Sequence, residues 1–253
     1  MADFGTYARN AAINALLRNT ALQIAQAYAS LHTGDPGTAG ANELAVANAY
    51  IRKAATFGAP SGGATNNSSP VVFGPATPAG WSAAAYEGLW DQEAAGGNFI
   101  AGHILGTART AGIGDDITFA ATALTFALAG WSTYARNAVV NALLRNTALQ
   151  VASTKISLHS GDPGLVGSNE LTGDTYARVA ATWDDPTSTP GVTRNTGAVT
   201  FATAGASWTA ITHFGIWDAG TNFIYGNVIT VSPKNVAIGE TAKFAVGALV
   251  VTA

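Results

Sequence analysis

Apolar and polar positions predict a short helix that the chain contains twice. The stretch TYARNAAINALLRNTALQIA begins at Thr6, and TYARNAVVNALLRNTALQVA begins 127 positions later at Thr133. Within each stretch the isoleucine, valine and leucine side chains recur at helical spacing. Threonine favours the N-cap position, and the asparagine at Asn19 tolerates the left-handed conformation that often ends a helix. We therefore expect one short helix, capped by Thr6 or Thr133, at the start of each copy.

The pattern after each helix changes to that of strands. Residues 27–32 and 155–159 alternate large apolar with small polar side chains, as half-buried strands do. The sequence GDPG then supplies turn residues in both copies. Further apolar runs predict strands at 71–73, 211–217 and 223–229, final strands at 117–126 and 242–251, and loops at 58–70 and 184–195.

The repeat continues beyond the helix to the end of each copy. The same aromatic residues stand at equivalent positions of the two copies: Tyr50 and Tyr176, Phe73 and Phe201, Trp81 and Trp208, Trp90 and Trp217, and Phe99 and Phe223. A repeat of about 120 residues exceeds the roughly 20–50 residues of solenoid units and has the size of a domain. Short strands separated by turns indicate antiparallel sandwiches. We predict a mainly β fold of two tandem antiparallel β-sandwich or jelly-roll-like domains, 1–129 and 130–253, each preceded by a short α-helix.

Composition narrows the possible partners. The chain of 253 residues is 48% hydrophobic, enough for two buried cores, which excludes a disordered chain. Only 11% of residues are charged, less than half of the usual quarter or so. The surface must therefore consist mostly of small polar residues, as suits a protein packed among copies or one outside the cell. The net charge of −3 and the lack of a lysine or arginine run predict no nucleic-acid partner.

Other sequence features exclude several kinds of site. The chain has no cysteine, hence no disulfide, no thiolate nucleophile and no cysteine-based zinc site. The first residues lack the pattern of a signal peptide. The longest apolar candidate, 117–131, is interrupted by threonines and glycine and falls short of the about 18 residues of a membrane span. We therefore expect a soluble chain without a recognisable export signal and without a membrane partner.

The order of motifs resembles small virion proteins of tailed bacteriophages that are labelled tail-fibre or head-decoration proteins. Matching stretches are 30–37 and 157–164 around LH[TS]GDPG, Asn42-Glu43 and Asn169-Glu170, Tyr176-Ala177-Arg178, 213–218, and 244–252. The second copy, with HFGIWDAGTNFIYGNV, fits better than the first, where residues 87–91 read EGLWD. These motifs consist of turns and core aromatics, so the resemblance implies a virion location and a β fold.

Histidine and aspartate recur together at His32 and Asp35, and again at His159 and Asp162. Such a pair could serve acid–base chemistry or form half of a metal site. Alternatively, the histidine ends a strand and bonds turn backbone, while the aspartate forms an Asx-turn before proline. We favour the structural alternative, because no second histidine or carboxylate cluster joins either pair with ligand spacing.

No other motif predicts catalysis or metal binding. The chain lacks a GxSxG elbow, and His103 and His213 have no counterpart in the other copy, which disfavours a catalytic triad. The adjacent acids Asp115-Asp116 and Asp184-Asp185 could bind a cation but are expected to be surface loop residues. We therefore predict no catalytic, cofactor-binding or metal-binding residue.

Aromatic and arginine residues are the remaining candidates. Trp81, Trp90, Trp208 and Trp217 could stack on sugars, but their repeated positions in apolar strands favour the core. Arginine is favoured at interfaces, and few charges exist elsewhere. We expect an interface that uses Arg9, Arg18, Arg136 and Arg145 on the predicted helices and Trp131 at the domain junction.

We predict a non-enzymatic phage structural protein on the capsid exterior. It would be a decoration or cement protein that binds the major capsid protein and copies of itself in a homo-oligomer such as a trimer, in which three chains present six similar domains. The alternative is a tail-fibre or receptor-binding protein whose loops 58–70 and 184–195 recognise a host cell-surface glycan. A glycan hydrolase is disfavoured, because a repeated carboxylate pair is missing.

Overall fold

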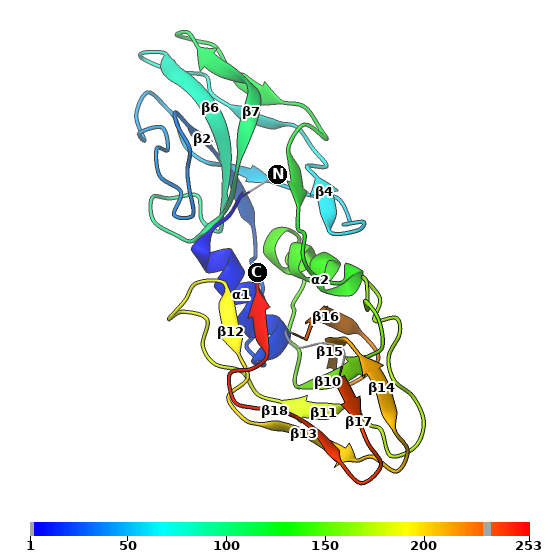
Figure 1. The fold of residues 1–253 in the computed structure, drawn as a ribbon. Helices are drawn as coiled ribbons and strands as arrows, with labels where there is room; N and C mark the ends of the chain where they lie inside the picture. The colour runs from blue at the N-terminus through cyan, green and yellow to red at the C-terminus, as the bar shows by residue number, and fades with distance from the viewer. Residues whose placement is uncertain (1–2, 230–233) are drawn as a thin grey trace. The chain divides into compact units, whose positions relative to one another are not determined.

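The protein is mainly β, as the sequence predicts. The computed structural model describes residues 3–229 and 234–253 (Figure 1). These residues form two compact units. Unit 1 comprises the chain up to Arg9, Leu22–Leu128 and Val139–Ala148, and unit 2 comprises Asn10–Ala21, Ala129–Ala138 and Leu149–Ala253.

Each unit contains chain from both repeats. The residues of helix α1 (Thr6–Leu17) from Asn10 onward belong to unit 2. Those of helix α2 (Thr133–Leu144) from Val139 onward belong to unit 1. The two units therefore do not coincide with the two sequence repeats. The domain boundary predicted between residues 129 and 130 separates the repeats and stays a prediction.

Both helices end as the sequence predicts, but neither has the predicted threonine as its N-cap. Asn19 and Asn146 follow the helices with φ of 56° and 53°, the left-handed conformation that asparagine tolerates. The hydroxyl of Ser132 accepts a hydrogen bond from the Ala135 backbone N–H at 3.0 Å, so Ser132 caps α2. Gly5 holds the equivalent place before α1, because its carbonyl oxygen accepts from the Arg9 backbone N–H at 3.1 Å. The predicted caps at Thr6 and Thr133 were therefore each wrong by one residue.

Unit 1 contains one five-stranded antiparallel sheet in the order β1-β7-β6-β2-β3 and two strand pairs, β4-β9 and β5-β8. Its strands are β1 (Asp3–Phe4), β2 (Ala27–His32), β3 (Lys53–Ala55), β4 (Ala64–Asn66), β5 (Val71–Phe73), β6 (Trp81–Trp90), β7 (Phe99–Ala111), β8 (Ile117–Phe119) and β9 (Thr125–Ala127). The long β6–β7 hairpin forms its centre (Figure 1).

Unit 2 contains a four-stranded antiparallel sheet in the order β11-β10-β15-β16 and the pairs β12-β19, β13-β18 and β14-β17. Its strands are β10 (Thr154–His159), β11 (Val179–Ala181), β12 (Val192–Arg194), β13 (Val199–Thr203), β14 (Trp208–Ile211), β15 (His213–Asp218), β16 (Phe223–Val228), β17 (Lys234–Val236), β18 (Thr241–Phe244) and β19 (Val250–Thr252). Strand β10 pairs with β15 as β2 pairs with β6.

Two details of the strand prediction were wrong. The predicted final strands 117–126 and 242–251 are each divided into two strands with different partners. A turn separates β8 from β9, where Thr122 has a φ of 68°, and Gly247 has a φ of 75° between β18 and β19. The predicted loops 58–70 and 184–195 contain the short strands β4 and β12.

The same three rings anchor the core of both units. Tyr50 stacks on Phe73 at 6.1 Å and meets Trp81 edge-on at 5.7 Å. The equivalent rings in unit 2, Tyr176, Phe201 and Trp208, lie at 6.1 and 5.7 Å. Burial of one large ring stabilises a core by about 1.5–3 kcal/mol. These repeated aromatic residues therefore serve to pack the cores.

Among the described residues, neither helix has the length and apolar character needed to span a membrane.

Candidate binding site

The repeated histidines are buried in hydrogen-bond networks rather than exposed in a site. His32 and His159 are both 0% exposed. In unit 1 the Ser30 hydroxyl accepts a bond from Trp90 Nε1 at 3.0 Å and lies 2.8 Å from His32 Nε2, while Nδ1 lies 2.6 Å from the Ala41 carbonyl oxygen. In unit 2 the matching distances are 2.9, 2.7 and 2.7 Å.

This network sets the tautomer of the imidazole. A carbonyl oxygen only accepts, so Nδ1 of His32 must carry the proton. In the neutral ring, Nε2 then accepts from the serine hydroxyl. Burial lowers the pKa of His32 and of His159, because it penalises the charged imidazolium. Both rings are structural parts of the strand end.

The aspartates confirm the structural interpretation. Asp35 Oδ1 accepts a hydrogen bond from the Gly37 backbone N–H at 2.8 Å, and Asp162 Oδ1 accepts one from Gly164 at the same distance. These are Asx-turns. The prediction that histidine bonds turn backbone and aspartate shapes the turn is confirmed in both copies.

The motifs NE and YxR meet in a network that the sequence analysis did not predict. Glu43 binds Arg52 through two hydrogen bonds, from Nε at 2.9 Å and from Nη2 at 2.8 Å. Tyr50 donates to the same carboxylate and accepts from the backbone N–H of Leu31. The Arg52 guanidinium also lies 3.6 Å from the Trp90 ring centroid. Glu170, Tyr176, Arg178 and Trp217 repeat the arrangement.

The four repeated tryptophans lie in the core, as predicted. Trp81, Trp90, Trp208 and Trp217 are between 6% and 8% exposed. The guanidinium groups over Trp90 and Trp217 occupy the ring face that a sugar would need. These rings are therefore not a stacking platform for glycan.

Two of the predicted interface arginines bind within their own unit. Arg18 Nη1 donates to Asn14 Oδ1 at 2.7 Å and forms an ion pair with Asp185 at 3.2 Å, all in unit 2. Arg145 donates to Asn141 at 2.7 Å and to the Phe57 carbonyl oxygen at 3.3 Å. A role at an interface with another chain stays a prediction for both.

The other predicted interface residues are half-buried or buried. Arg9 and Arg136 are half-buried. Trp131 is 2% exposed, and its ring lies 5.6 Å from that of Tyr225 within unit 2. Trp131 therefore packs in the core of unit 2.

The acidic pairs form turn and loop contacts. Asp184 Oδ1 accepts from the Thr193 hydroxyl at 2.8 Å, and Asp115 Oδ2 accepts from the Gly112 backbone N–H at 3.1 Å. Within residues 3–229 and 234–253, no group of three or more histidine or acidic side chains has the arrangement of a metal site.

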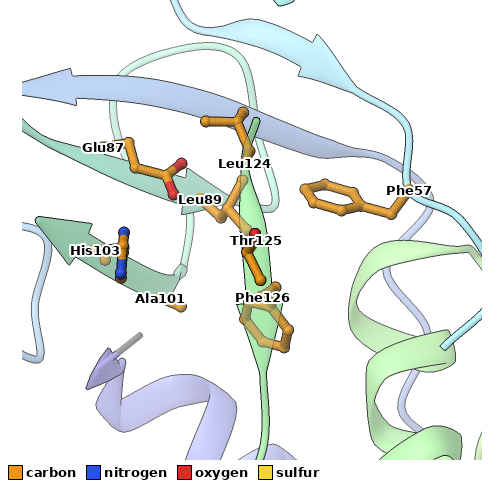
Figure 2. A pocket seen from close by; sticks show the side chains of 9 residues that line it. Phe57, Glu87, Leu89, Ala101, His103, Leu124, Thr125 and Phe126 are labelled. Atoms are coloured by element: carbon orange, nitrogen blue, oxygen red, sulfur yellow. The ribbon is translucent and has the colours of Figure 1, made fainter. Parts of the chain in front are cut away.

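One polar pair in unit 1 departs from the repeat. Glu87 on β6 lies opposite His103 on β7 and opposite Leu31 on β2. Figure 2 shows both polar side chains on one side of the sheet, with the Glu87 carboxyl group directed towards Leu89 and Leu124. Glu87 is only 6% exposed, and its Oε2 has no hydrogen-bond partner among the described residues.

Glu87 and His103 line two adjoining cavities. The small cavity measures about 10 Å³, the size of one water molecule. It is lined by Phe57, Glu87, Leu89, Ala101, Gly102, His103, Leu124, Thr125 and Phe126. The open cavity measures about 650 Å³ and is lined by Glu87, His103, Ile104, Leu105, Gly106, Thr107, Arg109, Phe119 and Ala123. The polar pair thus lines both the small space and the larger open cavity.

Burial raises the pKa of Glu87 to about 8. Its carboxyl group is therefore mostly protonated at neutral pH and can donate a hydrogen bond, which an ionised carboxylate cannot do. Perturbed carboxyl groups beside a cavity are typical of functional sites.

The sequence contained a signal for this site. Residues 87–91 read EGLWD where the second copy reads FGIWD, so Glu87 takes the place of Phe214. By sequence alone, this difference only weakens the match of the first copy to the motif. A carboxyl group at the position of a core ring was the informative feature.

A family model described as Gp80, podophage GP4 fiber I protein gp80, matches the chain twice, over residues 3–127 and 130–252. The two matches support the duplication inferred from the sequence. No curated protein matches the chain.

Proposed function

Since the chain belongs to the family of the podophage GP4 fiber I protein gp80, and is thus a phage virion structural protein, we propose that it is a non-enzymatic tail-fibre protein that attaches the particle to a host-surface glycan. The observation that carries this proposal is the family match over both repeats.

The fibre alternative is better supported than the decoration protein that the sequence favoured. The family description names a fibre and does not mention the head. A fibre with several copies would hold the cell by many weak contacts.

The chemistry of the described residues supports binding without catalysis. His32 and His159 are fully buried in structural networks. Among the described residues, Glu87 is the single carboxyl group that lines the open cavity, whereas most glycosidases need two. The geometry therefore favours a site that holds a ligand and releases it unchanged.

Binding of the fluorescently labelled full chain to host cells tests the proposal. We expect saturable binding that periodate treatment of the cells abolishes, because periodate cleaves vicinal diols of sugars, and that protease treatment leaves intact. Incubation with purified host glycan should release no shorter product. Binding that only protease removes, or cleavage of the glycan, would contradict this function.

A further inference from the structure

The open cavity beside Glu87 is not required by the fold. Leu31 pairs with Glu87, and Leu158 pairs with Phe214, so the two residues hold equivalent places. In unit 2 the Phe214 ring packs against Phe244 at 6.2 Å. A phenylalanine therefore satisfies this fold position, while a buried carboxyl group costs free energy unless it is bonded. Stability does not explain Glu87.

The neighbours of Glu87 also differ between the units. Ala101 pairs with Leu89 in unit 1, whereas Tyr225 pairs with Ile216 in unit 2. A small residue thus replaces a second ring, and His103 replaces Asn227. At this place unit 1 has less aromatic packing than unit 2 and has two titratable side chains that unit 2 lacks. These two side chains form a polar wall, that is, a polar part of the lining of the open cavity.

A cation completes this wall. Arg109 lies on β7, and its Nη1 donates to the Thr118 carbonyl oxygen at 3.1 Å. Its guanidinium carbon lies 4.8 Å from the Phe119 ring centroid. These contacts orient the side chain along the cavity, and a guanidinium has five N–H donors, so one bond leaves others for a ligand.

We propose that the open cavity lined by Glu87, His103 and Arg109 binds the carboxylate of an acidic sugar, and this proposal rests on the proposed function. Arg109 suits a carboxylate, which it can bind through two parallel hydrogen bonds. One guanidinium matches one negative charge, whereas phosphate sites commonly use several donors or cations. Ile104 and Leu105 provide apolar surface for the sugar ring.

The charge of the lining favours an anion. The titratable or charged groups that line the cavities with Glu87 are His103 and Arg109, both on β7. The lining residues from β8, β9 and the segment between them carry no ionisable side chain. Glu87 is mostly uncharged at neutral pH, so it does not repel a carboxylate bound in the open cavity.

The test measures binding of methyl β-D-glucuronoside to the ¹⁵N-labelled full chain by NMR titration, with methyl β-D-glucoside as the matched neutral sugar. Methyl glycosides of galacturonate and N-acetylneuraminate complete the panel of acids. We expect at least one acid to bind about tenfold or more tightly than its neutral counterpart, with shifts centred on β7. Equal binding of acid and neutral sugar, or no binding by any acid, would overturn the proposal.

Variants in the full chain locate the site. Arg109→Gln should weaken binding of the acid about tenfold or more. Trp81 pairs with Ala111, and its counterpart Trp208 pairs with Val236. Arg109 and Lys234 each stand two residues before these partners. Lys234→Gln is therefore the matched control and should bind as the wild type does. Glu87→Gln should retain binding at about pH 9, where the wild type loses most of it through ionisation of Glu87. Equal loss in both basic-residue variants would contradict the assignment.

The outcomes also separate this site from the proposed function. If the chain binds periodate-sensitive receptors on cells and Arg109→Gln does not weaken that binding, the fibre function stands and the site fails. If acidic sugars bind at β7 and the chain does not bind cells, the site stands and the attachment function fails.

Discussion

Glu87 on β6 and Phe214 on β15 occupy the same position in two copies of one sheet, opposite Leu31 and Leu158 respectively. One chain therefore contains both a buried carboxyl group and a buried ring at the same place in the fold. The second copy shows what packing alone selects. The first copy buries a carboxyl group that packing alone does not select.

Glu87 should make stability fall as pH rises. Its pKa is 4.5 in the unfolded reference and about 8 in the fold, so between these values the folded state binds more protons. The stabilising contribution of protonated Glu87 is complete below about pH 4.5 and is lost as pH rises through about 8. Urea unfolding should show Glu87→Gln gaining stability relative to wild type between about pH 5 and 8. A constant difference across this range would contradict the buried, protonated carboxyl group.

The buried histidines His32 and His159 should make stability fall as the pH decreases. Their folded pKa lies below the ordinary value of 6.5, so the unfolded chain binds more protons as pH falls below about 6.5. The contribution is complete above that pH and is lost on acidification. In a Glu87→Gln background, the urea midpoint should fall between about pH 7 and 5. The added change His159→Asn, which keeps a donor near the place of Nδ1, should lower stability overall and reduce this slope.

Gly215 should not tolerate a side chain. A Cβ at Gly215 would lie 2.4 Å from the Ser157 hydroxyl and 2.5 Å from His159 Nε2, inside the buried network. Gly215→Ala should therefore destabilise the fold by about 1–3 kcal/mol. Gly106→Ala is the control, because nothing lies within 4 Å of a Cβ there. Equal melting temperatures for the two variants would show that the network does not restrict this position.

The two copies of the glutamate–arginine pair should differ in strength. The Arg52 side chain is 6% exposed in its pair with Glu43, whereas Arg178 is 25% exposed in its pair with Glu170. Removing one partner of a buried pair costs about 3–5 kcal/mol, and solvent screens the more exposed pair. Glu43→Ala should therefore destabilise the chain more than Glu170→Ala in chemical denaturation. The reverse order would contradict this ranking.

Features that repeat in the sequence were the ones that could be predicted. The helix ends at Asn19 and Asn146, the Asx-turns at Asp35 and Asp162 and the buried tryptophans follow from local chemistry and from the spacing of apolar residues. The division of the predicted final strands was missed, since Thr122 gives no local signal for its positive φ. The assignment of the helix ends to the two units depends on contacts between residues far apart in the sequence, which no local pattern indicates.

The site was missed for a different reason. Glu87 and His103 lie on different strands and meet only through the register of β6 and β7. Comparison of the copies identified shared residues, whereas the site consists of residues that the copies do not share. The Glu43–Arg52–Tyr50 network was likewise seen only as separate motifs, because their pairing requires the fold.

Immunogold labelling of intact virions with an antibody against this chain tests the central claim most directly. The account predicts gold particles on the fibres at the tail and none on the head shell. Gold distributed over the shell, with hundreds of copies per particle, would contradict a fibre protein and favour a decoration of the capsid.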